Sequence, residues 1–191
     1  MPKVVDVEQR RSELADAVAR VIARSGLEAA SMRRVAAEAG WTTGTLVHYF
    51  SNKRELLQFT LETSLERRRV QRFDRASLRP AEAIRRTLES ALPLDEESRL
   101  HWIVTIAFTA QATSDPELAA TQRDAYREFR SYLVRLVRDD DESLSRGEAT
   151  VEAERLIALA DGIALQALFD PDSWPPEAQV RALDHGLKAR A

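Results

Sequence analysis

The stretch from Met32 to Lys53 constrains the fold of this chain most, because a glycine separates two short segments that both have helical spacing of apolar residues. Ser31 supplies a side-chain acceptor for the start of a helix predicted over residues 31–39. One face of this helix carries Val35, Ala36 and Ala39. Gly40 predicts its end, since the residue after a helix often adopts a left-handed conformation that costs glycine little. The small side chain of Ala36 lets a second helix cross closely.

The second helix is predicted to begin at Thr42 or Thr43 and to bury Leu46, Tyr49 and Phe50, with Trp41 in the turn between the two helices. The residues left exposed on it are small or polar: Thr43, Gly44, Thr45, Val47 and His48. Such groups at the start of a short helix suit entry into the major groove of DNA. An ordinary helical hairpin is the alternative, but it does not explain this exposed polar run followed by Lys53.

The segment VAAEAGWTTGTLVHYFSNKRELL, which starts at Val35, resembles the DNA-binding segment of TetR-type transcriptional regulators. The residues predicted to contact DNA are Arg33, Thr42, Thr43, Gly44, Thr45, Val47, His48, Tyr49 and Lys53. Many family members carry Tyr where this chain has Val47, which offers only an apolar contact, for example to a thymine methyl. Lys53 lies in the first turn of the next helix, where a cation opposes the helix dipole, so we interpret it as a phosphate contact. Arg33 reaches either a base or a phosphate.

Composition excludes several other classes of function. The chain has no Cys and three His, with no two-histidine metal spacing and no glycine-rich phosphate loop, so we expect no enzyme, no cofactor and no metal site. The acidic run at 139–142 lacks the alternating ligands of a calcium loop and is interpreted as a solvated loop. No apolar stretch has the length of a signal peptide core or a membrane span, which predicts a cytoplasmic protein without membrane association.

The charge of the chain is unevenly distributed. Residues 1–75 carry 14 Lys and Arg against 10 Asp and Glu, or +4, whereas residues 76–191 carry 14 against 21, or −7. A mildly basic first part is compatible with DNA binding although the net charge of the whole chain is −3.

The remaining chain carries helical patterns and no strand pattern or repeat. Helices are predicted over 7–25, 53–72, from 80 to Pro93, 95–112, 114–138, 150–169 and after Pro176. The prediction is therefore an all-α fold of about nine helices. Residues 1–52 form a three-helix, helix-turn-helix DNA-binding head, and residues 53–191 form a larger body for effector binding and dimerisation.

The last two predicted helices have more apolar surface than one domain covers. The helix over 150–169 is apolar almost all round, and the final helix has one narrow apolar stripe, which together suit half of a two-fold four-helix interface. The predicted interface residues are Leu156, Ile163, Leu168, Val180, Leu183 and Leu187. A single monomeric core is the alternative. The family resemblance also implies a homodimer that binds palindromic DNA, and the segments DPELAATQRDAYREFR and ALADGIALQALFDP resemble the BetI-like subgroup.

The resemblance further implies an effector pocket in the body. Its predicted lining is Phe59, Thr63, His101, Trp102, Ile106, Gln111, Tyr126 and Phe129, which suits a mostly apolar small molecule. Ordinary core packing is the other interpretation of each of these residues.

The sequence thus predicts a DNA-binding transcriptional regulator, a repressor that a small-molecule effector releases from a palindromic operator. The alternative from another class is a helical small-molecule-binding protein or enzyme without DNA binding. A chain that retains no duplex DNA at low salt would favour that alternative.

Overall fold

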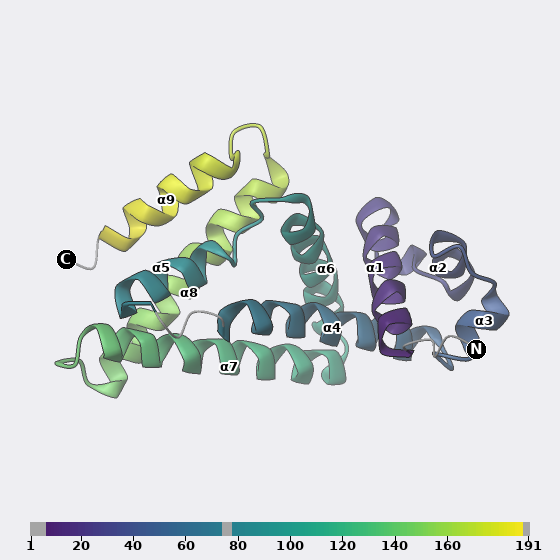
Figure 1. The fold of residues 1–191 in the computed structure, drawn as a ribbon, viewed down its shortest axis with the longest axis horizontal. Coiled ribbons are helices and arrows are strands. Elements are labelled where there is room, and N and C mark those ends of the chain that lie inside the picture. The colour runs from purple at the N-terminus through teal and green to yellow at the C-terminus, as the bar shows by residue number, and fades with distance from the viewer. Residues whose placement is uncertain (1–6, 74–77, 189–191) are drawn as a thin grey trace, which may run out of the picture. The chain divides into compact units, whose positions relative to one another are not determined.

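The computed structural model describes residues 7–73 and 78–188, and these residues form helices and connecting turns without a strand (Figure 1). The elements in order are α1 (Val7–Ser25), the 3-10 helix η1 (Leu27–Ala29), α2 (Met32–Glu38), α3 (Thr43–Val47), α4 (Lys53–Phe73), α5 (Pro80–Glu89), α6 (Glu96–Ala112), α7 (Pro116–Asp140), α8 (Arg146–Phe169) and α9 (Pro176–Lys188). The prediction of an all-α fold with about nine helices is confirmed for this part of the chain.

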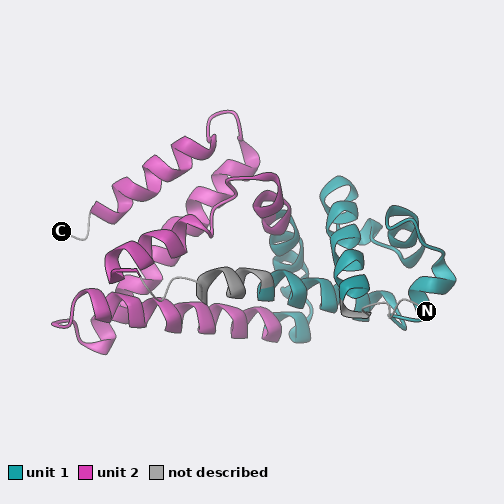
Figure 2. Ribbon diagram, in the orientation of Figure 1, with its two compact units in different colours: residues 1–67, 103–119 teal, residues 68–102, 120–191 magenta. Residues whose placement is uncertain are grey.

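The chain forms two compact units (Figure 2). Unit 1 comprises residues 1–67 and 103–119, and unit 2 comprises residues 68–102 and 120–191. Helices α4, α6 and α7 each contribute residues to both units. The compact units therefore differ from the functional division predicted at residue 52, because the start of α4 and residues 103–119 pack with the helix-turn-helix segment.

Unit 1 is organised around an apolar stripe on α1. Leu14, Val18 and Ile22 are buried against side chains from several other elements. These partners are Val35, Ala36, Leu46, Phe50, Leu56, Leu61, Val104, Phe108 and Leu118. Burial of apolar surface is the main stabilising contribution, at about 25 cal/mol per Å². The helix-turn-helix therefore shares one core with the first part of α4 and with residues from α6 and α7.

Two glycines set the turns of unit 1. Gly26 has a φ of 79° after α1, and Gly40 has a φ of 70° after α2. Both values lie in the left-handed region, as the sequence predicts for Gly40. The backbone N–H of Trp41 donates to the carbonyl oxygen of Ala36 at 2.7 Å, which closes the turn toward α3.

Unit 2 has its own core and several polar links between α5, α8 and α9. The Arg85 side chain of α5 pairs with Asp184 of α9 at 2.8 Å. The Arg155 side chain of α8 donates to the carbonyl oxygen of Gly186 in α9 at 3.3 Å. A Cβ on Gly186 would lie 2.4 Å from Leu159 Cδ2, so the absence of a side chain there permits the close approach of α9 to α8.

Some of the helix ends predicted from the sequence are wrong. Helix α8 begins at Arg146 rather than near Thr150, because Ser145 and Glu148 form a capping box in which each side chain accepts from the other residue's backbone N–H. The hydrogen bonds from Ser145 lower the pKa of the Glu148 carboxyl group. Helix α7 extends to Asp140, so the predicted acidic loop is shorter than expected, and α5 ends at Glu89 before it reaches Pro93.

Candidate nucleic-acid interface

Two hydroxyl side chains start the helices of the helix-turn-helix. Ser31 Oγ accepts from the backbone N–H of Arg34 at 3.3 Å, as predicted for the start of α2. Thr42 Oγ1 accepts from the backbone N–H of Thr45 at 3.0 Å and lies 2.9 Å from Thr45 Oγ1. The hydroxyl groups of Thr42 and Thr45, both predicted to contact DNA, therefore already stabilise the start of α3.

The outer face of α3 and the residue that follows it are exposed. Thr43, Gly44, Val47 and His48 are open to solvent, whereas Thr45 is half-buried. Val47 has 51% of its surface exposed, which is unusual for a branched apolar side chain among polar neighbours. The structure thus brings together small, polar and apolar groups on one short surface that fits the contacts a major groove offers.

The inner face of the same segment is fixed by packing. Leu46 and Phe50 are buried in the core of unit 1. Tyr49 is half-buried, and its ring centroid lies 5.3 Å from that of Trp41. Tyr49, predicted both to be buried and to contact DNA, therefore contributes its ring to the packing of the turn, and only its remaining surface faces solvent.

Lys53 has a structural partner that the sequence analysis did not foresee. Its Nζ donates to the backbone carbonyl oxygen of Glu28 at 3.1 Å and lies 3.9 Å from the Glu28 carboxylate. The prediction that Lys53 is a cation without a structural reason is therefore wrong. The two residues lie 25 positions apart in the sequence and give no local signal, since the contact exists only because η1 folds back beside the start of α4.

A second cation, Arg54, links the start of α4 to the start of α7. Arg54 pairs with Asp115 at 3.0 Å and with Glu117 at 2.7 Å, and hydrogen bonds to Glu117 and Asp115 raise its pKa. Asp115 Oδ1 also accepts from the backbone N–H groups of Glu117 and Leu118 at the start of α7. Sequence reasoning missed this link, although it predicted a helix from residue 114.

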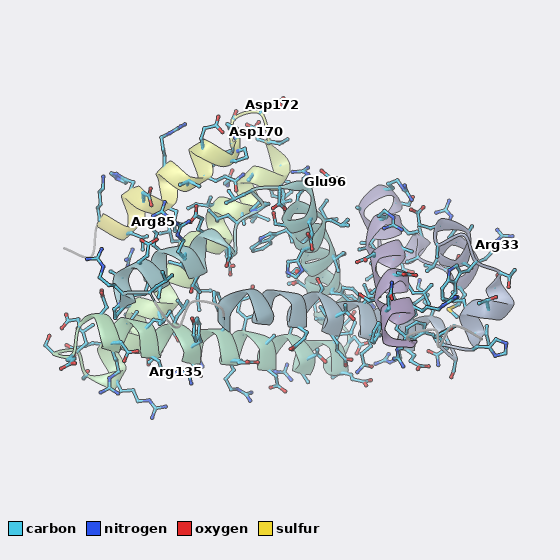
Figure 3. All side chains as sticks on the ribbon, viewed as in Figure 1. Arg33, Arg85, Glu96, Arg135, Asp170 and Asp172 are labelled. Carbon is cyan, nitrogen blue, oxygen red and sulfur yellow. The ribbon has the colours of Figure 1, made fainter. Side chains whose placement is uncertain are left out.

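Basic side chains on α2 remain exposed beside α3. Arg33 projects from α2 into solvent, as Figure 3 shows. It has no hydrogen-bond or ion-pair partner among residues 7–73 and 78–188, so it is available for either the base or the phosphate contact predicted for it. Arg34 is also exposed.

The residues predicted to line an effector pocket lie in both units. Phe59, Thr63, Ile106 and Gln111 belong to unit 1, and His101, Trp102, Tyr126 and Phe129 belong to unit 2. Trp102 is buried and its Nε1 donates to the carbonyl oxygen of Ala91 at 2.6 Å. Tyr126 is 43% exposed and lies in a surface groove of about 460 Å³ between α7 and α8. The pocket as a set of eight residues stays a prediction.

Three of the six predicted dimer-interface residues are covered within the chain itself. Leu156, Ile163 and Leu183 are buried, and Leu168, Val180 and Leu187 are half-buried. The three buried residues leave little or no surface for a partner, because α5, α8 and α9 of the same unit pack together. The exposed apolar residues of α8 are instead Val151, Leu165 and Phe169.

Metal binding and membrane insertion find no support in this part of the chain. No group of His, Asp and Glu side chains within residues 7–73 and 78–188 is arranged to hold a metal ion. None of the helices formed there has the length and apolarity needed to cross a bilayer.

The helical fold and the exposed short helix define a helix-turn-helix DNA-binding protein. Residues 14–58 match the family model "Bacterial regulatory proteins, tetR family", and residues 80–191 match the model "BetI-type transcriptional repressor, C-terminal". The chain therefore belongs to the TetR family. It is a DNA-binding transcriptional regulator and not an enzyme, which confirms the predicted class and the BetI-like resemblance.

Relatives cover most of the chain. It is 36% identical over 173 residues to the HTH-type transcriptional regulator PksA of Bacillus subtilis (strain 168), covering 90% of this chain and 84% of that protein. A transcriptional regulator from Rhodococcus sp. RHA1 has a solved structure with 34% identity, a TM-score of 0.83 and 94% coverage of each chain. A protein from Saccharomonospora viridis, solved in complex with choline, shares the fold at 21% identity and a TM-score of 0.85, with coverage of 95% and 96%.

Replacement of Lys53 by Ala separates its structural contact from a phosphate contact. The variant should melt at a lower temperature, because it loses the hydrogen bond to Glu28. If Lys53 also binds a phosphate, the plot of log K against log salt for duplex binding should become shallower by about one unit per subunit. Lys188→Ala, an exposed lysine of α9, is the matched control and should change neither quantity. A lower melting temperature with an unchanged salt slope would restrict Lys53 to a structural role.

Proposed function

We propose that this chain is a homodimeric repressor that binds a palindromic operator and is released from it by a mostly apolar small molecule. The observation that carries the proposal is the exposed surface of Thr43, Gly44, Val47 and His48 on a helix-turn-helix whose inner face is buried. The proposed place of action is the cytoplasm, where bacterial operator DNA lies.

In this proposal α3 reads the base sequence of the DNA. The hydroxyl of Thr43 and the imidazole of His48 offer donors and acceptors to base edges, and Val47 offers an apolar contact to a thymine methyl. Gly44 has no side chain and lets the helix approach the groove closely. Arg33 and Lys53 supply phosphate contacts that orient the head, or in the case of Arg33 a base contact.

A stripe on α8 supports the proposed homodimer. The α8 stripe consists of exposed small or apolar residues at helical spacing: Val151, Ala158, Gly162, Leu165 and Phe169. Val151 is 67% exposed and Phe169 is 75% exposed, so both ends of the stripe leave apolar surface in water. In a two-fold dimer each subunit offers the same surface to the other, and the surface must be complementary to itself.

The order of four of the five residues in the α8 stripe meets this symmetry requirement. Val151 and Phe169 lie at equal sequence distances before and after Ala160, and so do Ala158 and Gly162. Two antiparallel copies centred there would pair Val151 of each subunit with the partner's Phe169, and Ala158 with the partner's Gly162. The small central residues permit a close approach of the two helices, and the larger end residues fill the space beside it.

Release by an effector completes the proposal. The eight residues predicted to line the effector pocket form a mostly apolar set. A protein of the same fold has been solved with choline, a small organic ligand. We propose that the effector favours a state in which the two heads are spaced wrongly for the operator. Coupling of this kind is reciprocal, with a typical magnitude of about 1 to 3 kcal/mol.

Thr43→Ala and His48→Ala should change which DNA sequence is preferred. Selection from a pool of random duplexes gives the preferred sequence, and each variant should lose discrimination at particular base pairs, at a cost of about 1 to 3 kcal/mol for each lost contact. The salt slope should stay unchanged, since neither residue neutralises a phosphate. Thr113→Ala, an exposed threonine outside the helix-turn-helix, is the control. Unaltered preference in both variants would contradict reading by α3.

Gly162→Arg should separate the subunits without unfolding them. A Cβ on Gly162 meets nothing within 4 Å in the single chain, so the longer side chain is accommodated unless a partner covers it. Sedimentation should show a dimer of about twice 21.5 kDa for the wild type and the 21.5 kDa species for the variant, with equal helix content. Ala81→Arg, on the exposed face of α5, should remain a dimer. A dimeric Gly162→Arg protein would remove the α8 stripe from the interface.

Calorimetry tests the effector. Compounds that raise the melting temperature, with choline included in the screen, are titrated into the free protein and into the complex with the selected duplex. The bound duplex should lower the affinity for the compound by the same factor by which the compound lowers the affinity for the duplex. A compound whose affinity ignores the duplex would not be the effector of the proposed release.

A further inference from the structure

Two consecutive arginines near the start of α1 lie over aromatic rings at the two ends of α3. The guanidinium carbon of Arg10 is 5.4 Å from the ring centroid of Trp41. The guanidinium carbon of Arg11 is 5.0 Å from the Phe50 ring and 4.4 Å from the Phe59 ring. All five residues belong to unit 1. These distances are within the range in which a cation is attracted to the face of an aromatic ring.

The positions of the rings matter because α3 has few contacts of its own. The helix spans only Thr43–Val47, and Leu46 is its one buried residue. Trp41 precedes the helix, and its ring packs against that of Tyr49 in a tilted arrangement. Phe50 follows the helix, and its ring centroid lies 5.3 Å from that of Phe59 in α4. The rings at the two ends therefore hold α3 in unit 1 together with Leu46.

Arg11 destabilises this position relative to an apolar side chain if it serves only to pack. Its Nε is buried and has no hydrogen-bond partner among the described residues. A buried donor without an acceptor costs free energy that a leucine or methionine of similar volume would avoid. A guanidinium group is planar and weakly hydrated, so two aromatic faces offset part of this cost and fix the group in one orientation.

We infer that Arg10 and Arg11 are positioning residues for operator reading. They contact the rings on either side of α3 and so fix the angle at which Thr43 and His48 meet the base pairs. They act through Trp41, Phe50 and Phe59, not through a contact of their own with DNA. The inference rests on the proposal that α3 reads base pairs, and it adds residues from another helix that control the accuracy of that reading.

Positioning predicts a loss of selectivity without a loss of electrostatic attraction. A small rotation of α3 disturbs the directional hydrogen bonds of Thr43 and His48 to base edges, but leaves the phosphate contacts of unselective binding nearly intact. A phosphate contact by Arg11 would behave differently, since its loss weakens all sequences alike and reduces the salt slope. A positioning role therefore changes the selectivity, whereas a phosphate contact changes the overall affinity and the salt slope.

The test uses the full-length protein, the duplex selected from a random pool and a scrambled duplex of equal composition. In Arg11→Met the ratio of the two affinities should fall by roughly three- to tenfold, whereas the affinity for the scrambled duplex and the salt slope stay unchanged. Arg11→Lys keeps a cation over the rings and should restore much of the ratio. Arg135→Met is the matched control, because it removes a cation at 5.8 Å from the Tyr132 ring on α7 of unit 2 (Figure 3).

Phe59→Leu provides a second route if Arg11→Met folds poorly. It removes a ring under Arg11 while it keeps an apolar side chain, and it should lower the affinity ratio to a similar extent. The double variant Arg11→Met/Phe59→Leu should lose little more than Arg11→Met alone, because Arg11→Met already removes the contact with the Phe59 ring.

Three results would overturn the inference. They are a salt slope reduced by about one unit with both duplexes weakened equally, an unchanged ratio despite a lower melting temperature, and fully additive effects in the double variant. If Thr43→Ala and His48→Ala leave selectivity intact, the reading by α3 itself fails. If they reduce it and Arg11→Met does not, only the positioning role fails.

Discussion

The five-residue length of α3 is the constraint on which the DNA-binding surface depends. A helix of one and a half turns is unstable in water on its own, because its few hydrogen bonds do not offset the loss of backbone entropy. Its order must come from its surroundings. In this chain the Thr42 side chain caps its start, Leu46 and Phe50 anchor it in a core, and Gly40 sets the turn before it.

The same dependence explains why the helix-turn-helix is not a separate core. The side chains that cover Leu46 and Phe50 come from α1, from the first part of α4 and from residues 103–119. Lys53 and Arg54, adjacent residues in the first turn of α4, fix that turn to η1 and to the start of α7 respectively. The reading surface is thus supported by segments that are more than 60 residues away in the sequence.

Charge in unit 1 is arranged to leave selected cations exposed. Glu38 pairs with Arg20 and Arg24 of α1, and the hydrogen bond from Arg20 lowers the pKa of its carboxyl group. Arg54 is likewise engaged with acidic partners. Arg33 and Arg34 stay in solvent on α2, so these two cations are available beside α3 for a polyanion.

Local features of the fold could be predicted from the sequence, whereas contacts between distant segments could not. Gly40, Ser31 and the apolar spacing of α1 each determine structure through neighbours along the chain, and the structure confirms them. The partner of Lys53 lies 25 residues away, and no local pattern indicates it. Periodicity also shows that Leu156 and Leu183 face something apolar but not whether the same chain covers them. The capping box at Ser145 and Glu148 was visible as a Ser-x-x-Glu pattern and was overlooked.

Hydrogen exchange measured by mass spectrometry, on the free protein and with each duplex, tests most directly whether α3 reads DNA sequence. We expect the selected duplex to slow hydrogen exchange of the backbone amides from Thr42 to Phe50. A scrambled duplex of equal composition should leave the exchange of these amides unchanged. Both duplexes should slow exchange near Lys53, where the proposed contact is to phosphate. Equal protection of residues 42–50 by both duplexes, or protection by neither, would contradict the central claim.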